Sequence, residues 1–158
     1  MIATSNTGTC TAGKAAQIAG INPETLKVWT RRGFVPNKAE GGWSRYSVSD
    51  LIGIMALHRV TVRGAIDIST AAELFREHIF NVSEQVIQSA MANSAAYWIV
   101  SWWDEEGPKK ELTADPVEFI KGMVINPERP WIGGATLLNL SQIVRDVFAE
   151  MAKHLGGD

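Results

Sequence analysis

Residues 11–36 carry the signals for two short helices separated by only a Gly-Ile step. The first helix is expected from Thr11, a suitable N-cap residue, to about Ala19, with a glycine at its end. The second is expected to begin at 22–24, where Asn, Pro and Glu supply a capping side chain, a favourable first position and an acid in the first turn. It should end near Gly33. Because the connection is so short, the two helices must meet at a steep angle.

The residues around this connection fit a compact two-helix unit. Small Ala16 allows a close approach of the helices, and Gly20 permits the turn between them. Leu26 and Trp29 fall on one face of the second helix, and we expect both in the core. This spacing is the helix-turn-helix pattern, in which the second helix lies in the major groove of DNA.

A second block follows at residues 41–51, with the sequence GGWSRYSVSDL. Its leading glycines favour a hairpin. Ser47 and Asp50 have the spacing of a capping box, with Asp in place of the usual Glu, so a helix is expected from there to about Arg63. The core side of that helix is expected to contain Leu51, Ile52, Met55 and Val62.

Two groups of residues stand in a characteristic order: Gly33, Phe34, Val35 and Pro36, then Gly42, Trp43, Arg45, Tyr46, Ser47 and Asp50. This order resembles the N-terminal head of the mercury-resistance-regulator (MerR) family of bacterial transcription regulators. In that family a glycine, an apolar pair and a proline follow the second helix, and a wing with an aromatic, an arginine and a tyrosine precedes the next helix. The resemblance covers residues 11–64 and implies a winged helix-turn-helix head that binds double-stranded DNA.

The side chains expected to contact DNA lie at the start of the first helix, on the second helix and in the wing. They are Thr11, Glu24, Thr25, Lys27, Thr30, Arg31, Trp43, Arg45 and Tyr46. Lys27 and Arg31 are four residues apart and share a face, from which long cations reach base edges or phosphates. The resemblance implies a phosphate contact for Arg45. Tyr46 either contacts DNA or fastens the wing onto the head.

The charge of the chain is distributed unevenly. Residues 1–64 contain eight Lys and Arg against three Asp and Glu, a charge of +5, whereas residues 65–158 contain seven against fourteen, a charge of −7. A basic N-terminal half suits a polyanionic partner, and the acidic half should face away from it.

Two more helices are expected, at 67–80 and at 84–92. The amino-acid composition then changes. Residues 96–103 are aromatic and β-branched, which is typical of a strand, and a turn at 104–109 precedes a returning strand at 110–113.

The rest of the chain is expected to contain a short helix at 115–123, a loop at 126–134 and a short strand at 136–140. A final helix then begins with Asn139 or Ser141 as its cap.

Together these elements predict an α+β fold. It consists of a winged helix-turn-helix head at 11–80, followed by a small α+β part at 95–158 with a β-hairpin and a C-terminal helix, and residues 1–10 are expected to form a disordered tail. The family's head is usually followed by a long coiled-coil helix that pairs two subunits, and no segment here is long enough for one.

The tryptophans of the expected strand have several open roles. Trp98 and Trp102 fall on one face and Trp103 on the other. They fill a core, form a dimer contact, or line a pocket for a small-molecule effector.

The final helix carries a wide apolar stripe, formed by Ile143, Val144, Val147, Phe148 and Met151. We expect this stripe and the tryptophan-rich strand to pair two copies of the chain as a homodimer. The alternative is that the helix and the strand cover each other within one chain.

Several protein classes are excluded by what the sequence lacks. It has no apolar run of about 20 residues that could span a membrane and no signal peptide. A single cysteine, Cys10, allows no internal disulfide and no multi-cysteine metal site, so neither a metal nor a cofactor is expected. The scattered histidines His58, His78 and His154 form no catalytic set, so we do not expect an enzyme.

The sequence therefore predicts a cytoplasmic, sequence-specific DNA-binding transcription regulator of bacterial or phage type. One alternative is a phage DNA-packaging or excision factor with a similar winged head. Another, of a different class, is a protein-interaction adaptor that does not bind DNA.

Overall fold

The structure is a computed structural model, and it describes residues 10–36, 39–40, 43–64, 66–104, 106–125 and 135–155. Within these residues the helices are α1 (Ala12–Ala19), α2 (Pro23–Arg31), α3 (Val48–Arg63), α4 (Ile68–Phe80), α5 (Glu84–Met91), α6 (Pro116–Ile125) and α7 (Leu140–Leu155). The strands are β1 (Cys10–Thr11), β2 (Ala39–Glu40), β3 (Trp43–Tyr46), β4 (Trp98–Asp104), β5 (Gly107–Thr113) and β6 (Ala135–Asn139). Helices and two small antiparallel sheets make this part of the chain α+β, as the sequence predicts. The tail expected at 1–9 and the loop expected at 126–134 lie outside the described residues.

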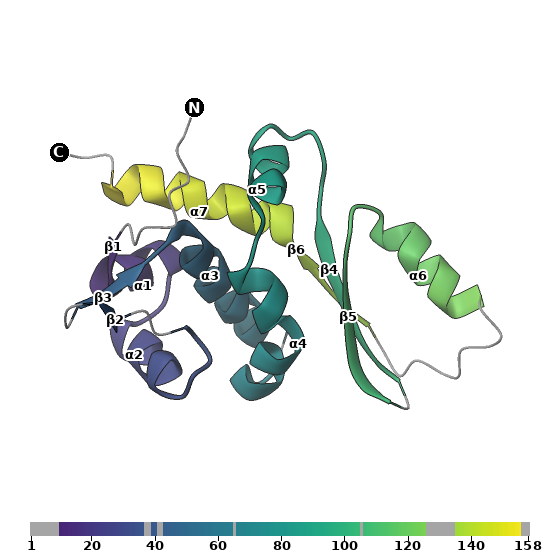
Figure 1. Ribbon diagram of the computed structural model, residues 1–158, viewed down its shortest axis with the longest axis horizontal. Helices are drawn as coiled ribbons and strands as arrows, with labels where there is room; N and C mark the ends of the chain where they lie inside the picture. Colours follow the sequence, from purple (N-terminus) through teal and green to yellow (C-terminus); the bar gives the residue numbers. More distant parts are fainter. Residues whose placement is uncertain are drawn as a thin grey trace.

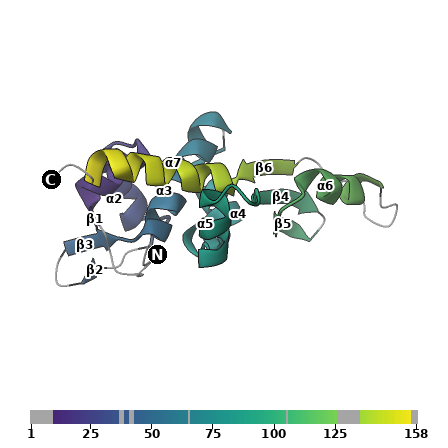
Figure 2. The same cartoon turned by 90° about the horizontal axis from the view of Figure 1, so that it is seen from above.

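The elements follow one another along a single long axis (Figure 1). Helices α1 to α4 and the sheet β1-β3-β2 form one end, which we call the head. The sheet β5-β4-β6 follows, and α6 lies at the opposite end. Helix α7 runs back from β6 across the head, where it contacts α1 and α3, and it also contacts α5. The view from above shows the same parts in a row (Figure 2).

The turn between α1 and α2 is made by the residues that the sequence singles out. Gly20 is the C-cap of α1 with a φ of 71°, in the left-handed region that glycine adopts without strain. Asn22 caps α2, because its side-chain oxygen accepts a hydrogen bond of 2.8 Å from the Glu24 N–H. Leu26 and Trp29 are both buried. The predicted two-helix unit is confirmed.

Helix α3 is the central helix of the head. The predicted capping box fixes its start: Ser47 Oγ accepts from the Asp50 N–H at 3.2 Å, and Asp50 Oδ2 accepts from the Ser47 N–H at 2.8 Å. Residues 50–57 are all buried, because α1, α4 and α7 pack around them. The expectation that Val62 faces the core is wrong. This side chain is 67% exposed, because it lies on the outer side of the last turn of α3, where Val60 is the residue that faces the core.

The first sheet contains a strand that the sequence does not reveal. Strand β1 pairs with β3, placing Cys10 opposite Tyr46 and Thr11 opposite Arg45. Cys10 is only 4% exposed and packs in the core, so the expectation that the disordered tail includes it is wrong. A two-residue strand depends on backbone pairing with a neighbour, which local sequence propensity cannot indicate.

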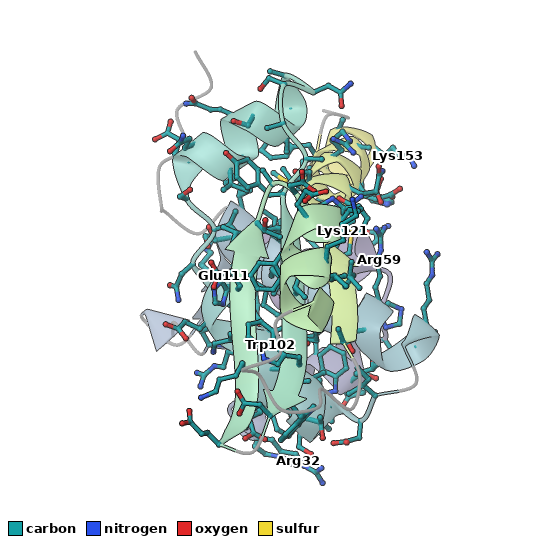
Figure 3. All side chains as sticks on the ribbon, turned by 90° about the vertical axis from the view of Figure 1, so that its right-hand side faces the viewer. Arg32, Arg59, Trp102, Glu111, Lys121 and Lys153 are labelled. Atoms are coloured by element: carbon teal, nitrogen blue, oxygen red, sulfur yellow. The ribbon has the colours of Figure 1, made fainter. Side chains whose placement is uncertain are left out.

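Strand β4 is the central strand of the second sheet, between β5 and β6. On one face Val100 and Trp102 pack against α6, and the rings of Trp102 and Phe119 have centroids 5.4 Å apart. Figure 3 shows α6 in front of this face of the sheet. On the other face Ile99 belongs to the hydrophobic cluster that includes the head. Both faces of β4 are thus covered within the chain.

Helix α7 buries its apolar stripe within the same chain. Ile143, Val144 and Val147 are at most 2% exposed, and Phe148 and Met151 pack against the same cluster. The cover comes from the head and α5, so this stripe does not form a free surface for a second copy. One cluster extends from β1 to α7, and the boundary expected between the head and the part at 95–158 stays a prediction.

A glycine in the middle of α3 is explained by its neighbour on α4. A Cβ atom at Gly53 would overlap the ring of Phe80, and that ring is only 6% exposed. Glycine inside a helix costs about 1 kcal/mol relative to alanine. Here this cost is offset by the close approach of the Phe80 ring to the α3 backbone.

We expect Gly53→Ala to lower the free energy of unfolding by about 1–3 kcal/mol, because the added methyl group displaces Phe80. Urea unfolding followed by circular dichroism measures this. The control is Gly122→Ala in α6, where the added methyl group meets open space and should stabilise by about 0.5–1 kcal/mol. A Gly53→Ala protein as stable as the original would contradict the packing of Phe80 on α3.

Candidate nucleic-acid interface

The exposed face of α2 carries cations that have weak partners or none. Lys27 and Arg31 are exposed and lie on the same side of the helix. The Lys27 Nζ is 3.8 Å from the Glu24 carboxylate, but the two side chains are 74% and 78% exposed. An exposed ion pair of this kind contributes little stability, so Lys27 can exchange Glu24 for another anion. Thr25, also on α2, is half-buried.

Arg32 extends the cationic face beyond the end of α2. It is the C-cap residue and is exposed, and it lies at the lower edge of the molecule in Figure 3. The helical pattern points to Arg31 but not to Arg32, which stands past the last helical residue. Its only sequence signal is that it adjoins Arg31.

Thr30 and Tyr46 join α2 to the hairpin formed by β2 and β3. Thr30 Oγ1 donates to the Leu26 carbonyl at 2.9 Å and lies 3.3 Å from the Tyr46 hydroxyl. Either of these two oxygens can be the donor between them. Tyr46 is only 4% exposed. This geometry matches the alternative in which Tyr46 fastens the hairpin onto the head.

Thr11 and Arg45 lie side by side at the start of α1. They are directly opposite each other in the β1–β3 pair, and both are exposed. Side chains of directly opposed residues point to the same face of a sheet. The Thr11 side chain makes no capping bond to the first N–H groups of α1, the helix that follows the residue paired with Arg45. Trp43 is the first residue of β3, and its side chain is outside what the structure describes.

The two ends of the molecule differ in how their cations are paired. Beyond the head, Lys109, Lys110 and Lys121 each lie within 2.8 Å of a carboxylate. In the head, Arg31, Arg32 and Arg45 have no ion pair within the described part of the chain. Within the described residues, α2 and Arg45 thus carry exposed positive charge with little or no pairing to carboxylates.

The side chains with a predicted effector or dimer role do not form one surface. Trp102 is 8% exposed in the core under α6, Trp98 is half-buried, and Trp103 is 45% exposed. Val147 is fully buried in its own chain, whereas Phe148 is half-buried at the rim of the same cluster. Met151 is half-buried on the following turn.

Among the residues that the structure describes, no group of three or more His, Cys, Asp and Glu side chains is placed to hold a metal ion. No described helix combines the length and the apolar character needed to cross a bilayer.

Comparison with known proteins finds a family match for the N-terminal part of the chain. Residues 10–63 match the family model described as MerR HTH family regulatory protein. A search of curated proteins finds no match to this chain. The matched range begins at β1 and ends with α3, so it contains the α1–α2 unit and the β2–β3 hairpin. Residues 10–63 of the head are therefore similar to the helix-turn-helix domain of MerR-type regulatory proteins.

Proposed function

We propose that this protein is a sequence-specific DNA-binding transcription regulator. In this proposal α2 lies in the major groove, and the β2–β3 hairpin acts as a wing on the phosphate backbone. The main support is the set of exposed cations on α2 and at Arg45, within the range 10–63 that matches the MerR family model. Among the described residues, Arg31, Arg32 and Arg45 have no ion pair, and Lys27 has only its exposed pair with Glu24. A regulator of this kind acts in the cytoplasm, on double-stranded DNA.

We infer separate roles for the side chains from where they lie. Lys27 and Arg31 project from the exposed face of α2, where they reach base edges or phosphates. Arg45 and the open N–H groups of α1 bind a phosphate, because backbone donors at a helix N-terminus favour an anion. The hydrogen bond between Tyr46 and Thr30 holds the wing at a fixed angle to α2.

Two copies of the protein would double these contacts. A single module buries about 600–1,000 Å² on DNA, which seldom gives a high specific affinity. The homodimer expected from the sequence thus remains part of the proposal. Since α7 is covered within the chain, pairing would use another surface, such as the end of the molecule with exposed Val117 and Leu137.

The proposal is tested by binding-site selection from random DNA, followed by affinity measurements at several stated salt concentrations. A selected motif bound at least about a thousandfold more tightly than unrelated DNA supports a regulator. Equal affinity for all sequences, or no binding at low salt, contradicts it.

We expect Lys27→Ala to change which DNA sequences are preferred. If the ammonium group contacts a base, the binding free energy for the preferred sequence should weaken by about 1–3 kcal/mol. Repeating the selection with the variant measures this. Lys121→Ala is the matched control, because this lysine lies on α6 at the far end of the molecule. A uniform loss of affinity over all DNA sequences would indicate that Lys27 contacts a phosphate. No loss of affinity would contradict the placement of α2 in the groove.

We expect Arg45→Ala to weaken binding to all sequences alike, because a phosphate contact carries no base information. The slope of log affinity against log salt should fall by about one unit. Salt titrations of both proteins on a selected and an unrelated DNA supply the measurement. If circular dichroism shows an intact fold and neither quantity changes, Arg45 does not contact DNA.

A further inference from the structure

A cleft lies between the end of α1, the C-terminal half of α3, and α7. Its volume is about 330 Å³, which is within the range of pockets that hold small ligands. The α1 wall includes Gln17 and Ile18, and the α7 wall includes Glu150. None of the DNA contacts proposed above lines this cleft.

Apolar side chains form the floor of the cleft, and an exposed valine lies at its rim. Ile18 and Met55 are 1% and 3% exposed, so their accessible atoms form an apolar floor. Val62, which also lines the cleft, is 67% exposed. An apolar tail lying on this floor would cover Val62 and remove its surface from water.

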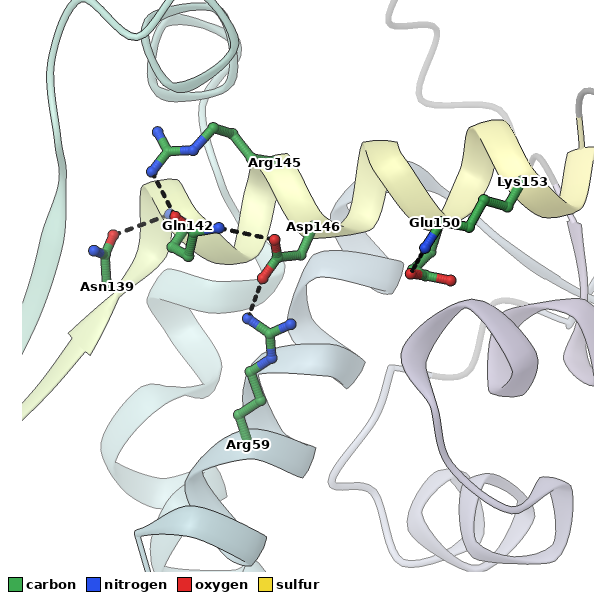
Figure 4. Close-up of polar contacts among 7 residues, drawn as sticks. All are labelled: Arg59, Asn139, Gln142, Arg145, Asp146, Glu150 and Lys153. Atoms are coloured by element: carbon green, nitrogen blue, oxygen red, sulfur yellow. Dashed lines mark hydrogen bonds and ion pairs between the residues drawn. The ribbon is translucent and has the colours of Figure 1, made fainter.

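The acids near the cleft are already paired. Asp146 Oδ2 accepts from the Arg59 Nη1 at 2.6 Å (Figure 4). The Glu150 carboxylate is 2.5 Å from the Lys153 Nζ and 3.5 Å from the His154 Nε2, and Figure 4 shows the Lys153 pair on the adjoining turns of α7. These pairs leave little negative charge to repel an anion.

Positive charge in the cleft remains uncompensated. Arg63 lines the cleft, is exposed, and has no ion pair within the described residues. His58 lies beside it, and burial together with the guanidinium groups of Arg59 and Arg63 lowers the pKa of this imidazole. Both arginines are thus close enough to influence charge at His58. A carboxylate placed there would meet an arginine whose planar fork matches its geometry.

We propose that this cleft binds a small carboxylate with an apolar tail. Arg63 binds the carboxylate, and Ile18, Met55 and Val62 pack against the tail. Gln17 and the neutral His58 ring offer further hydrogen-bonding groups at the same site.

Occupation of the cleft is coupled to DNA binding, and this second step rests on the proposed function. One wall is the last turn of α1 and Gly20, which leads into α2, and the other is α3 with α7. A ligand that holds these walls together alters the free energy of the α1–α2 arrangement. By linkage, DNA then changes the affinity for the ligand by the same factor.

Isothermal titration calorimetry on the full chain without DNA tests the binding step, with three probes. Octanoate has both the charge and the tail, octanamide lacks the charge, and inorganic phosphate lacks the tail. We expect saturable binding of octanoate, and a loss of about tenfold or more for octanamide, for phosphate and for octanoate with the Arg63→Gln variant. Arg76→Gln, at an exposed arginine of α4, is the matched control and should bind octanoate like the original.

Failure to bind octanoate, or equal binding by the Arg63→Gln variant, would overturn the site. Octanamide or phosphate binding as tightly as octanoate would do the same. If Arg63→Gln weakens DNA binding and lowers its salt slope while octanoate binding is unchanged, Arg63 is a DNA contact and the site is wrong. Absence of DNA binding by the original protein would refute the proposed function without affecting the calorimetric result.

Discussion

The structure depends on the burial of α3 on nearly all of its sides. The capping box of Ser47 and Asp50 fixes where this helix begins, and from there α1, α4 and α7 all pack against it. Gly53 lets the Phe80 ring approach the α3 backbone, which sets the spacing between α3 and α4. Since α1 is in contact with α3, the position of the recognition unit α1–α2 is set by the same helix.

Helix α7 connects the second sheet to this centre by a chain of hydrogen bonds. Arg59 of α3 donates to Asp146, Gln142 donates to the other oxygen of Asp146, and Arg145 donates to Gln142 (Figure 4). Arg145 also donates to the Ala90 carbonyl of α5 at 3.3 Å. A polar network between packed helices fixes their relative positions.

The sequence predicts those parts of the fold that local chemistry determines. Caps such as Asn22 and Ser47, and the left-handed turn at Gly20, mark helix ends wherever they occur. Which element covers a given face of a helix or strand cannot be predicted from the local sequence. An apolar stripe on α7 indicates that something packs there, but only the structure identifies the head of the same chain. The cationic face of α2 could be predicted from its periodicity, whereas the burial of Tyr46 follows from packing of the hairpin against the head, where its hydroxyl lies 3.3 Å from Thr30 Oγ1 of α2.

The uneven distribution of charge bears on how the proposed regulator would approach DNA. The basic residues 1–64 lie in the head, whereas part of the acidic remainder, on β4, β5 and α6, lies toward the opposite end of the molecule. The field of such a charge distribution steers a protein toward a polyanion, but at physiological ionic strength it is screened beyond about 8 Å. Long-range steering thus sets which end meets DNA mainly at low salt. In the proposed function, contacts within one Debye length decide the approach at physiological salt. Among the described residues, the exposed cations of α2 and Arg45 have no carboxylate as near as those that pair with Lys109, Lys110 and Lys121.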